Sequence, residues 1–249
     1  MDGSTILGIE TWRPFFNAGL THFFFSINKG TVIHTWMVLF LLFLFLILAR
    51  YSLRFKKTVT YFATLSGVRS LMDLVGQTLG GFFFNHLSFI AALFVFILFC
   101  NSVPLIPWLE EPTRDINTTL ALGIISFCYI QWFTIRAHGL GSYMKGYFSP
   151  FFLMFPLNVM GKISSVISLS FRLFGNVFGG AIIALLYSKL IEGSVILESI
   201  GLFSGVNFLI LFFFGLFEGA LQAFVFAMLS LTYLSIALQT DETPAKDTQ

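Results

Sequence analysis

The sequence predicts an all-α integral membrane protein with five transmembrane helices plus a surface amphipathic helix, the last two spans being long and steeply tilted as a hairpin. Hydrophobic residues make up 57% of the 249 residues and charged residues only 10%, against about 25% charged in soluble domains. Uncharged runs of about 20 residues, enough helix to cross about 30 Å of hydrocarbon, recur along the chain. The last two runs are longer than one upright crossing needs. We therefore expect residues 1–249 to form a single membrane domain.

The first half of the chain predicts one span, a basic segment and a helical hairpin. The first span covers residues 31–49, after the N-terminal segment 1–30. Residues 50–80 are basic, and their last part mixes charged and apolar residues, which indicates an amphipathic helix lying on the membrane surface. Residues 82–135 contain two uncharged runs separated by prolines and acidic residues, so we expect a hairpin of two spans.

The second half predicts two longer helices, within residues 156–238, and a polar tail at 240–249. The stretch from Val206 to Leu238 has about 33 residues, or about 50 Å of helix. Such a helix fits a 30 Å core only if it is steeply tilted or broken. A tilted hairpin presents a broad side surface, which suits a partner that moves past it.

The distribution of basic residues predicts the orientation of the chain. Five spans with the N-terminus outside place most loop arginines and lysines on the cytoplasmic side, where the positive-inside rule expects them. The cytoplasmic group is Arg50, Arg54, Lys56, Lys57, Arg69, Arg136 and Lys145. The C-terminus is then cytoplasmic.

Composition also limits the other classes of function. Net charge is +2 and no basic patch is dense, so no nucleic-acid partner is expected. Cys100 and Cys128 lie in apolar runs, and we interpret both as small buried hydrophobic residues. The four histidines lie on separate segments, and we therefore expect no metal site and no cofactor.

Arg172 is the only charged residue between Ile163 and Ser188. An arginine at mid-membrane costs about 2.5–3.5 kcal/mol on insertion scales, and it stays charged at any working pH. Such a residue usually marks an ion path or an anionic partner. Its helical face at three- and four-residue spacing is polar or small throughout, and consists of Ser165, Ser168, Asn176 and Gly179.

The last helix carries a comparable polar face. Glu218 and Gln222 are four residues apart, and Tyr233 is roughly in line with them. Small residues repeat at four-residue spacing on both helices, and we expect them to allow close packing of the hairpin. They are Gly175, Gly179, Gly215, Gly219, Ala223 and Ala227.

These motifs resemble subunit a of F-type ATP synthases, in its bacterial form. The match lies in Ser-Leu-Ser-Phe-Arg-Leu-Phe-Gly-Asn at 168–176 and in Leu-Gln-Ala-Phe-Val-Phe at 221–226. His34-Thr-Trp, the Asp-Ile-Asn-Thr-Thr-Leu run from Asp115, and Pro156-Leu-Asn158 add to it. The resemblance covers most of the chain in the right order.

The resemblance implies a non-catalytic stator subunit for ion translocation in a rotary ATP synthase of a bacterial inner membrane, an organellar inner membrane being less expected. Its partners would be the c-subunit ring, the peripheral stalk b subunits, the rest of the ATP synthase complex and membrane lipid. Ions would reach the ring carboxylates through two offset half-channels, with Arg172 separating them.

The resemblance also implies roles for the other polar residues. Asn176 and Gln222 match polar positions near the arginine, although both side chains also serve as ordinary interhelical hydrogen-bonding groups. Ser168 either lines the cytoplasmic half-channel or bonds its own backbone. Glu218 is expected in the external half-channel, with Gln222, Asn176 or Arg172 as its partner. Further possible half-channel residues are Asn158, Ser165 and Tyr233.

The sequence departs from the family at two positions. Many members carry a titratable residue nine positions after the arginine and another seven before the glutamine, where this chain has Ala181 and Gly215. We expect Glu218 to replace both. Since a proton path needs titratable relays, we favour H⁺ as the coupling ion, with Na⁺ as the alternative.

A more remote alternative is a standalone secondary transporter or channel. Internal repeats and broken midplane helices would be expected of such a protein, and no repeat relates the two halves. A membrane enzyme or respiratory subunit would need paired histidines or a metal cluster, and the sequence contains neither.

Overall fold

The computed structural model describes residues 11–12, 27–54, 59–80, 84–106, 109–148, 151–192, 199 and 205–239. Within these residues five helical stretches are long and apolar enough to cross a membrane. The predicted all-α membrane fold is confirmed. A pair of two-residue antiparallel strands, β1 (Thr11–Trp12) and β2 (Ile27–Asn28), is an addition that the sequence pattern did not indicate.

The helices follow the predicted order, with boundaries that differ by a few residues at most places. In chain order they are α1 (Lys29–Ser52), α2 (Val59–Leu79), α3 (Phe84–Ser102), the 3₁₀ turns η4 (Val103–Leu105) and η5 (Pro112–Arg114), α4 (Ile116–Phe148), η6 (Phe152–Met154), α5 (Phe155–Ile191), α7 (Val206–Ile210), the π-helix η7 (Leu211–Glu218) and α8 (Gly219–Gln239).

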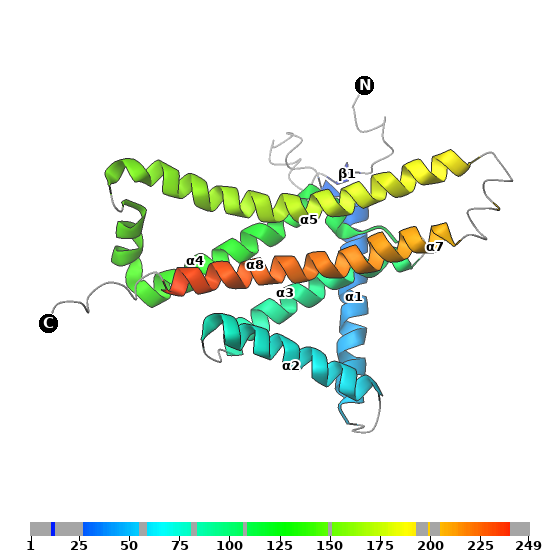
Figure 1. Cartoon of the computed structure of the whole chain (residues 1–249), viewed down its shortest axis with the longest axis horizontal. Helices are drawn as coiled ribbons and strands as arrows, with labels where there is room; N and C mark the ends of the chain where they lie inside the picture. The colour runs from blue at the N-terminus through cyan, green and yellow to red at the C-terminus, as the bar shows by residue number, and fades with distance from the viewer. Residues whose placement is uncertain are drawn as a thin grey trace.

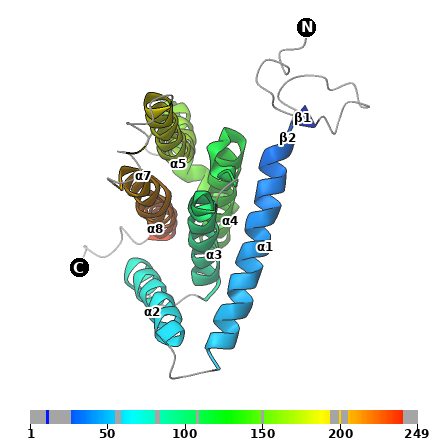
Figure 2. The same cartoon turned by 90° about the vertical axis from the view of Figure 1, so that its right-hand side faces the viewer.

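The helices form three layers. Figure 2 shows α5 and α8 on one side, α3 and α4 in the middle, and α1 on the far side. In Figure 1, α5 and the α7–η7–α8 helix run side by side and across the direction of α1 rather than along it. If α1 stands upright in the membrane, the hairpin of α5 and α8 therefore lies obliquely, as its length requires.

The middle layer holds the hairpin together. α5 packs most extensively against α4, and α8 packs most extensively against α3, whereas α5 and α8 touch each other less. The main core lies between these layers and includes Ile97 of α3, Leu173 of α5 and Phe226 of α8.

The prediction that glycines on both hairpin helices allow close packing is only half right. Gly219 and Ala223 of α8 are buried, and a Cβ on Gly219 would lie 2.8 Å from Asn101 Cβ on α3. On α5, however, a Cβ on Gly175 or Gly179 would meet nothing within 4 Å. A four-residue repeat of small residues marks a face, and only the tertiary fold decides whether that face meets another helix.

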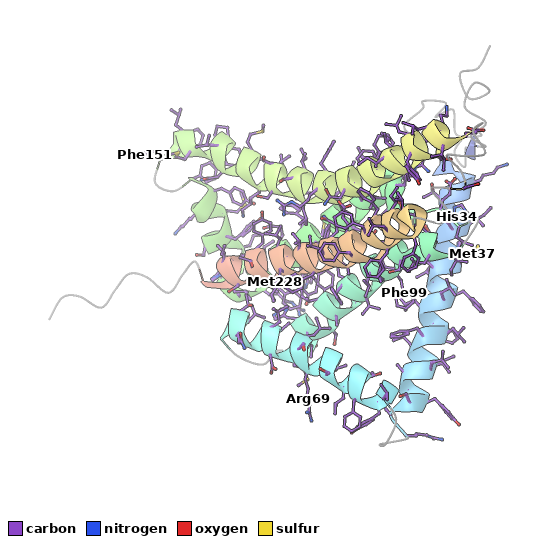
Figure 3. All side chains as sticks on the ribbon, turned by 45° about the vertical axis from the view of Figure 1, so that its right-hand side comes forward. His34, Met37, Arg69, Phe99, Phe151 and Met228 are labelled. Carbon is purple, nitrogen blue, oxygen red and sulfur yellow. The ribbon has the colours of Figure 1, made fainter. Side chains whose placement is uncertain are left out.

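The third span continues past its predicted end at residue 135. α4 extends to Phe148, and Gly139 interrupts it with φ 76° and ψ 155°. This backbone conformation favours glycine because it carries no Cβ. The residues after the kink turn toward the start of α5, and Phe151 lies at the corner between the two helices (Figure 3).

α2 is amphipathic, as its sequence indicates. Val75 is buried in the core, while Arg69, Asp73 and Gln77 are exposed. Figure 3 shows Arg69 projecting from α2 away from the other helices. This helix therefore has one face for the protein and one for water or lipid headgroups.

The interpretation of both cysteines as buried is wrong for Cys128. Cys100 is buried, but Cys128 is exposed on α4. Lipid is as apolar as a protein core. For that reason a hydrophobic residue of a membrane helix can face outward at no cost, and hydrophobicity alone does not predict burial there.

Candidate functional site

Arg172 lies on the open face of α5. Its side chain is exposed and makes no hydrogen bond or ion pair with any residue that the structure describes. Ser168, one turn earlier, and Gly175 are also exposed. A guanidinium exposed on a membrane-spanning helix needs water or an anionic partner, because the charge is expensive to keep in lipid.

A cavity of about 550 Å³ lies between α4, α5 and α8, and we name it the Lys162 cavity. Its polar wall contains Gln131, Tyr143, Tyr147, Asn158, Lys162 and Ser165. Tyr233 of α8 closes another side. The structure thus brings together all three residues, Asn158, Ser165 and Tyr233, that the sequence offered as possible channel lining. Ser168 does not line it.

The polar wall of the Lys162 cavity is connected by hydrogen bonds. The Tyr143 hydroxyl donates to Gln131 Oε1 at 2.7 Å and lies 2.6 Å from the Tyr147 hydroxyl. Lys162 Nζ sits 4.1 Å from the centre of the Tyr147 ring and 4.8 Å from that of Tyr143. A positive charge held over aromatic faces is stabilised by their quadrupoles. Buried Ser126 Oγ also lines this cavity and has no hydrogen-bond partner in the described structure.

A second, small cavity of about 30 Å³ lies on the other side of Arg172, between α3, α5 and α8. We name it the Gln222 cavity. It is lined by Asn101, Glu111, Asn176, Ala181, Glu218 and Gln222. Asn176 Nδ2 donates to Gln222 Oε1 at 2.6 Å, which joins α5 to α8. Gln222 is only 2% exposed, and within the part of the chain that the structure describes its Nε2 has no hydrogen-bond partner.

Asn101 forms a third corner of the Gln222 cavity and fixes the loop after α3. Its Nδ2 donates to the Gly219 carbonyl at 3.2 Å, and its Oδ1 accepts a 2.8 Å bond from Thr113 Oγ1. Because Thr113 belongs to η5, this pair of bonds ties the loop between α3 and α4 to the start of α8.

A third cavity, of about 390 Å³, adjoins the Gln222 cavity and opens along the same loop. We name it the Glu110 cavity. Its lining includes Glu110, Glu111, Arg114, Ala181, Tyr187 and Gly215. Glu111 and Ala181 line both cavities. Burial raises the pKa of the Glu111 carboxyl to about 7, against the opposing effect of Arg114, and the charges of Glu110 and Glu218 raise it further.

Arg172 falls between these spaces along α5. The α5 residues of the Lys162 cavity end at Leu169, and those of the Gln222 cavity begin at Asn176. The same order holds on the facing helix, where Tyr233 of α8 lines the first cavity and Glu218 of η7 lines the second. The two spaces therefore approach one arginine from opposite ends of the hairpin.

The backbone is irregular next to the Gln222 cavity. Glu218 is the last residue of the π-helix Leu211–Glu218, and Gly180 of α5 packs against Phe214 of this segment. π-helical turns are rare and occur frequently at functional sites. The wider turn changes the direction in which Glu218 projects, compared with a regular α-helix.

Six of the eight expected site residues line the Lys162 cavity or the Gln222 cavity, but one predicted contact is absent among the described residues. Glu218 makes no hydrogen bond with Gln222, Asn176 or Arg172 among the described residues. The sequence reasoning also missed Glu111 and Lys162. Lys162 carries the signal of an ionisable residue inside a membrane helix. Glu111 had a weaker signal, because it is a carboxylate in the short proline-containing segment between two spans.

The fold and the site define a polytopic helical membrane protein in which polar cavities lie on either side of Arg172 along the hairpin. The sequence model of the family described as ATP synthase A chain matches residues 32–235. ATP synthase subunit a of Legionella pneumophila (strain Paris) is 32% identical over 228 residues, which cover 90% of this chain and 94% of the relative.

Other relatives agree with this match. ATP synthase subunit a of Moorella thermoacetica is 32% identical over 83% of this chain and 89% of its own length. A protein of Propionigenium modestum named ATP synthase subunit a, sodium ion specific, is 34% identical over 82% of this chain and 72% of its own length. This chain belongs to the ATP synthase subunit a family. Its role is that of the ion-translocating stator part of the membrane sector.

Proposed function

We propose that this chain couples a flow of protons to rotation through two half-channels that Arg172 keeps apart. The observation that carries the proposal is the position of Arg172 between the Lys162 cavity and the Gln222 cavity. A single continuous pore would let ions cross without driving rotation. Two spaces that end on either side of a fixed positive charge force the ion to leave the chain and return.

The positive-inside rule supports an assignment of sides. With the N-terminus outside and the C-terminus in the cytoplasm of a bacterial cell, the Lys162 cavity opens to the cytoplasm and the Glu110 cavity to the outside. Arg136 and Lys145 of α4 then lie on the cytoplasmic side, and the acidic residues Glu110 and Glu111 lie outside.

The open face around Arg172 supports contact with a ring of c subunits. Gly175 and Gly179 leave free space beside the arginine, so another helix can approach closely. A carboxylate on that helix would be attracted in its ionised form by Arg172. It would release its proton before it passes and take up another on the far side. The peripheral stalk b subunits would hold this chain against the turning ring.

The energy that an ion leak would dissipate explains why a charged arginine is kept within a membrane helix. Each charge that crosses 100 mV releases about 2.3 kcal/mol. A leak between the two cavities would dissipate that energy as heat. The guanidinium blocks such a leak because it repels cations and cannot be deprotonated.

Replacement of Arg172 by alanine tests this proposal. We expect Arg172→Ala to abolish ATP-driven pumping and gradient-driven ATP synthesis in membrane vesicles, because nothing would then deprotonate the ring site or separate the cavities. The matched control is Arg136→Ala, an exposed arginine on α4 that lies over Trp132 and outside the cavities. Normal coupled synthesis in Arg172→Ala vesicles would refute the proposal.

Transport of Na⁺ by the same mechanism is the alternative, and the name of the Propionigenium modestum relative supports it. Glu218 favours the proton, because a titratable side chain in the path is useful to a proton relay and unnecessary for hydrated Na⁺. ATP-driven pumping that requires Na⁺ and persists with a protonophore would assign the path to sodium.

A further inference from the structure

The Glu110 cavity and the Gln222 cavity adjoin each other at Glu111, a residue of the loop before α4. The Glu110 cavity and the Gln222 cavity share Glu111, and they also share Gly180, Ala181 and Phe214. Of these four residues only Glu111 can carry a charge or a proton. An ion that moves from the Glu110 cavity into the Gln222 cavity must therefore pass the Glu111 carboxylate.

The position of Glu111 has no evident structural purpose. It is the N-cap residue of the 3₁₀ turn η5, but its side chain makes no capping hydrogen bond. It is half-buried and faces Arg114 and Glu110 of its own loop, Glu218 of η7, and, across the Glu110 cavity, Tyr187 of α5. A carboxylate that caps nothing and is withdrawn from water is costly unless it has another role.

The opposite wall of the Gln222 cavity supplies an independent sign of a ligand. Gln222 lines the cavity and is buried, its Oε1 is bonded to Asn176, and its Nε2 has no hydrogen-bond partner among the described residues. An unpaired buried donor costs about 1–3 kcal/mol. The cavity volume of about 30 Å³ suffices for one water molecule. A water molecule there would accept from Gln222 and donate to a carboxylate.

We propose that Glu111 and Glu218 form a two-carboxylate relay for a monovalent cation, with one water molecule between them under the Gln222 amide. The relay rests on the proposed function and specifies its outer half-channel. Glu111 supplies, from a loop, the ionisable group that the cavity walls lack at Ala181 and Gly215.

For a proton the relay step is balanced. The O–H bond of the Glu111 carboxylic acid breaks as its proton joins the water, and a different proton of that water forms the new O–H bond on the Glu218 carboxylate. Glu111 is left ionised and ready to take a proton from the Glu110 cavity. Two carboxylates that line one small cavity favour holding a single proton between them, because like charges disfavour double ionisation.

The test uses the assembled complex in proteoliposomes, with ATP synthesis driven by an imposed gradient as the readout. We expect Glu111→Gln to slow synthesis at least about tenfold, as removal of a proton-transfer group does. The control is Glu192→Gln, an exposed carboxylate at the end of α5 and outside the cavities. ATP hydrolysis by the same preparations reports that the complex is assembled.

The dependence on external pH distinguishes a relay from a structural role. Because the pKa of Glu111 is about 7, its protonated fraction falls as external pH rises through 7. The wild-type rate should fall over that range, and Glu111→Gln should lose this component. Glu111→Asp retracts the carboxylate by one methylene, so it should slow synthesis while keeping a dependence on external pH.

ATP synthesis driven by a proton gradient and ATP synthesis driven by a Na⁺ gradient together show which cation the relay carries. Loss of synthesis in Glu111→Gln under a proton gradient assigns the relay to H⁺, and loss under a Na⁺ gradient with a protonophore present assigns it to Na⁺. Wild-type rates for both Glu111 variants under both gradients would overturn the relay. If Arg172→Ala still abolishes coupling in that case, the proposed function stands and only the relay fails.

Discussion

Asn176 and Gln222 connect the two hairpin helices with one short hydrogen bond, 2.6 Å from Asn176 Nδ2 to Gln222 Oε1. This bond uses the oxygen of the glutamine and leaves its nitrogen on the cavity wall. The pair therefore ties α5 to α8 and lines the Gln222 cavity, which the proposed function makes part of the ion path. Sequence spacing singled out both residues, because each lies four residues from a second polar residue, and the structure brings their side chains together at one cavity.

The strength of the tie can be measured with a double-mutant cycle. Asn176→Leu and Gln222→Leu, singly and together, should show a coupling of about 0.6–1.7 kcal/mol in the free energy of unfolding, the range found for interhelical hydrogen bonds in membranes. The measurement is denaturation of the detergent-solubilised subunit. A coupling of zero would mean that the 2.6 Å contact contributes nothing to stability.

At the scale of elements, α8 approaches α3 most closely where Gly219 meets Asn101. The Gly219 carbonyl accepts a hydrogen bond from Asn101 Nδ2, and there is no room for a side chain at this point. The contact fixes the end of the π-helix, since Gly219 directly follows Glu218. Packing in this layer thus decides how Glu218 is presented to the cavity.

A single methyl group tests this contact. Gly219→Ala should destabilise the protein by about 1–3 kcal/mol, the usual cost of overpacking, because its Cβ would lie 2.8 Å from Asn101 Cβ. Gly175→Ala is the control, since its Cβ would meet nothing within 4 Å. Thermal unfolding of the purified subunit measures both. Equal stability of the two variants would show that α3 and α8 are free to shift.

At the scale of the whole molecule, the cavities lie at opposite ends of a tilted hairpin. The Lys162 cavity is built by α5, α8 and the parts of α4 on both sides of the Gly139 kink, whereas the Glu110 cavity is built by the loop before α4 together with α5 and η7. Figure 1 shows α5 and the α7–η7–α8 helix running across the direction of α1. If α1 stands upright in the membrane, cavities at opposite ends of this hairpin are therefore separated sideways as well as in depth.

Cysteine labelling measures the sides on which the cavities open. On a background with Cys100 and Cys128 replaced by serine, Ser165→Cys should react with a membrane-impermeant thiol reagent from the cytoplasmic side. Ala181→Cys should react from the outside, because it lines the Glu110 cavity. Inverted and right-side-out vesicles provide the comparison. Reaction of both cysteines from the same side would contradict the two half-channels.

The sequence by itself determined the membrane class and the five spans, and it named the residues that the proposed function places at the centre of the site. These features depend on local properties. The length of an apolar run predicts a span, and an isolated charge such as Arg172 is recognised because the residues around it are uncharged. Helical spacing was sufficient to group Asn176 with Arg172, and Glu218 with Gln222, because residues three or four apart share a face.

Only the tertiary structure decided which faces meet. It placed Glu111, from a loop distant in sequence, beside Ala181 and Glu218, and it turned Gly175 and Gly179 outward while Gly219 was packed against Asn101. Hydrophobicity could not predict these outcomes, since lipid and protein interior attract the same side chains. Contacts between segments far apart in the chain depend on how the helices cross, and a linear pattern carries no record of that geometry.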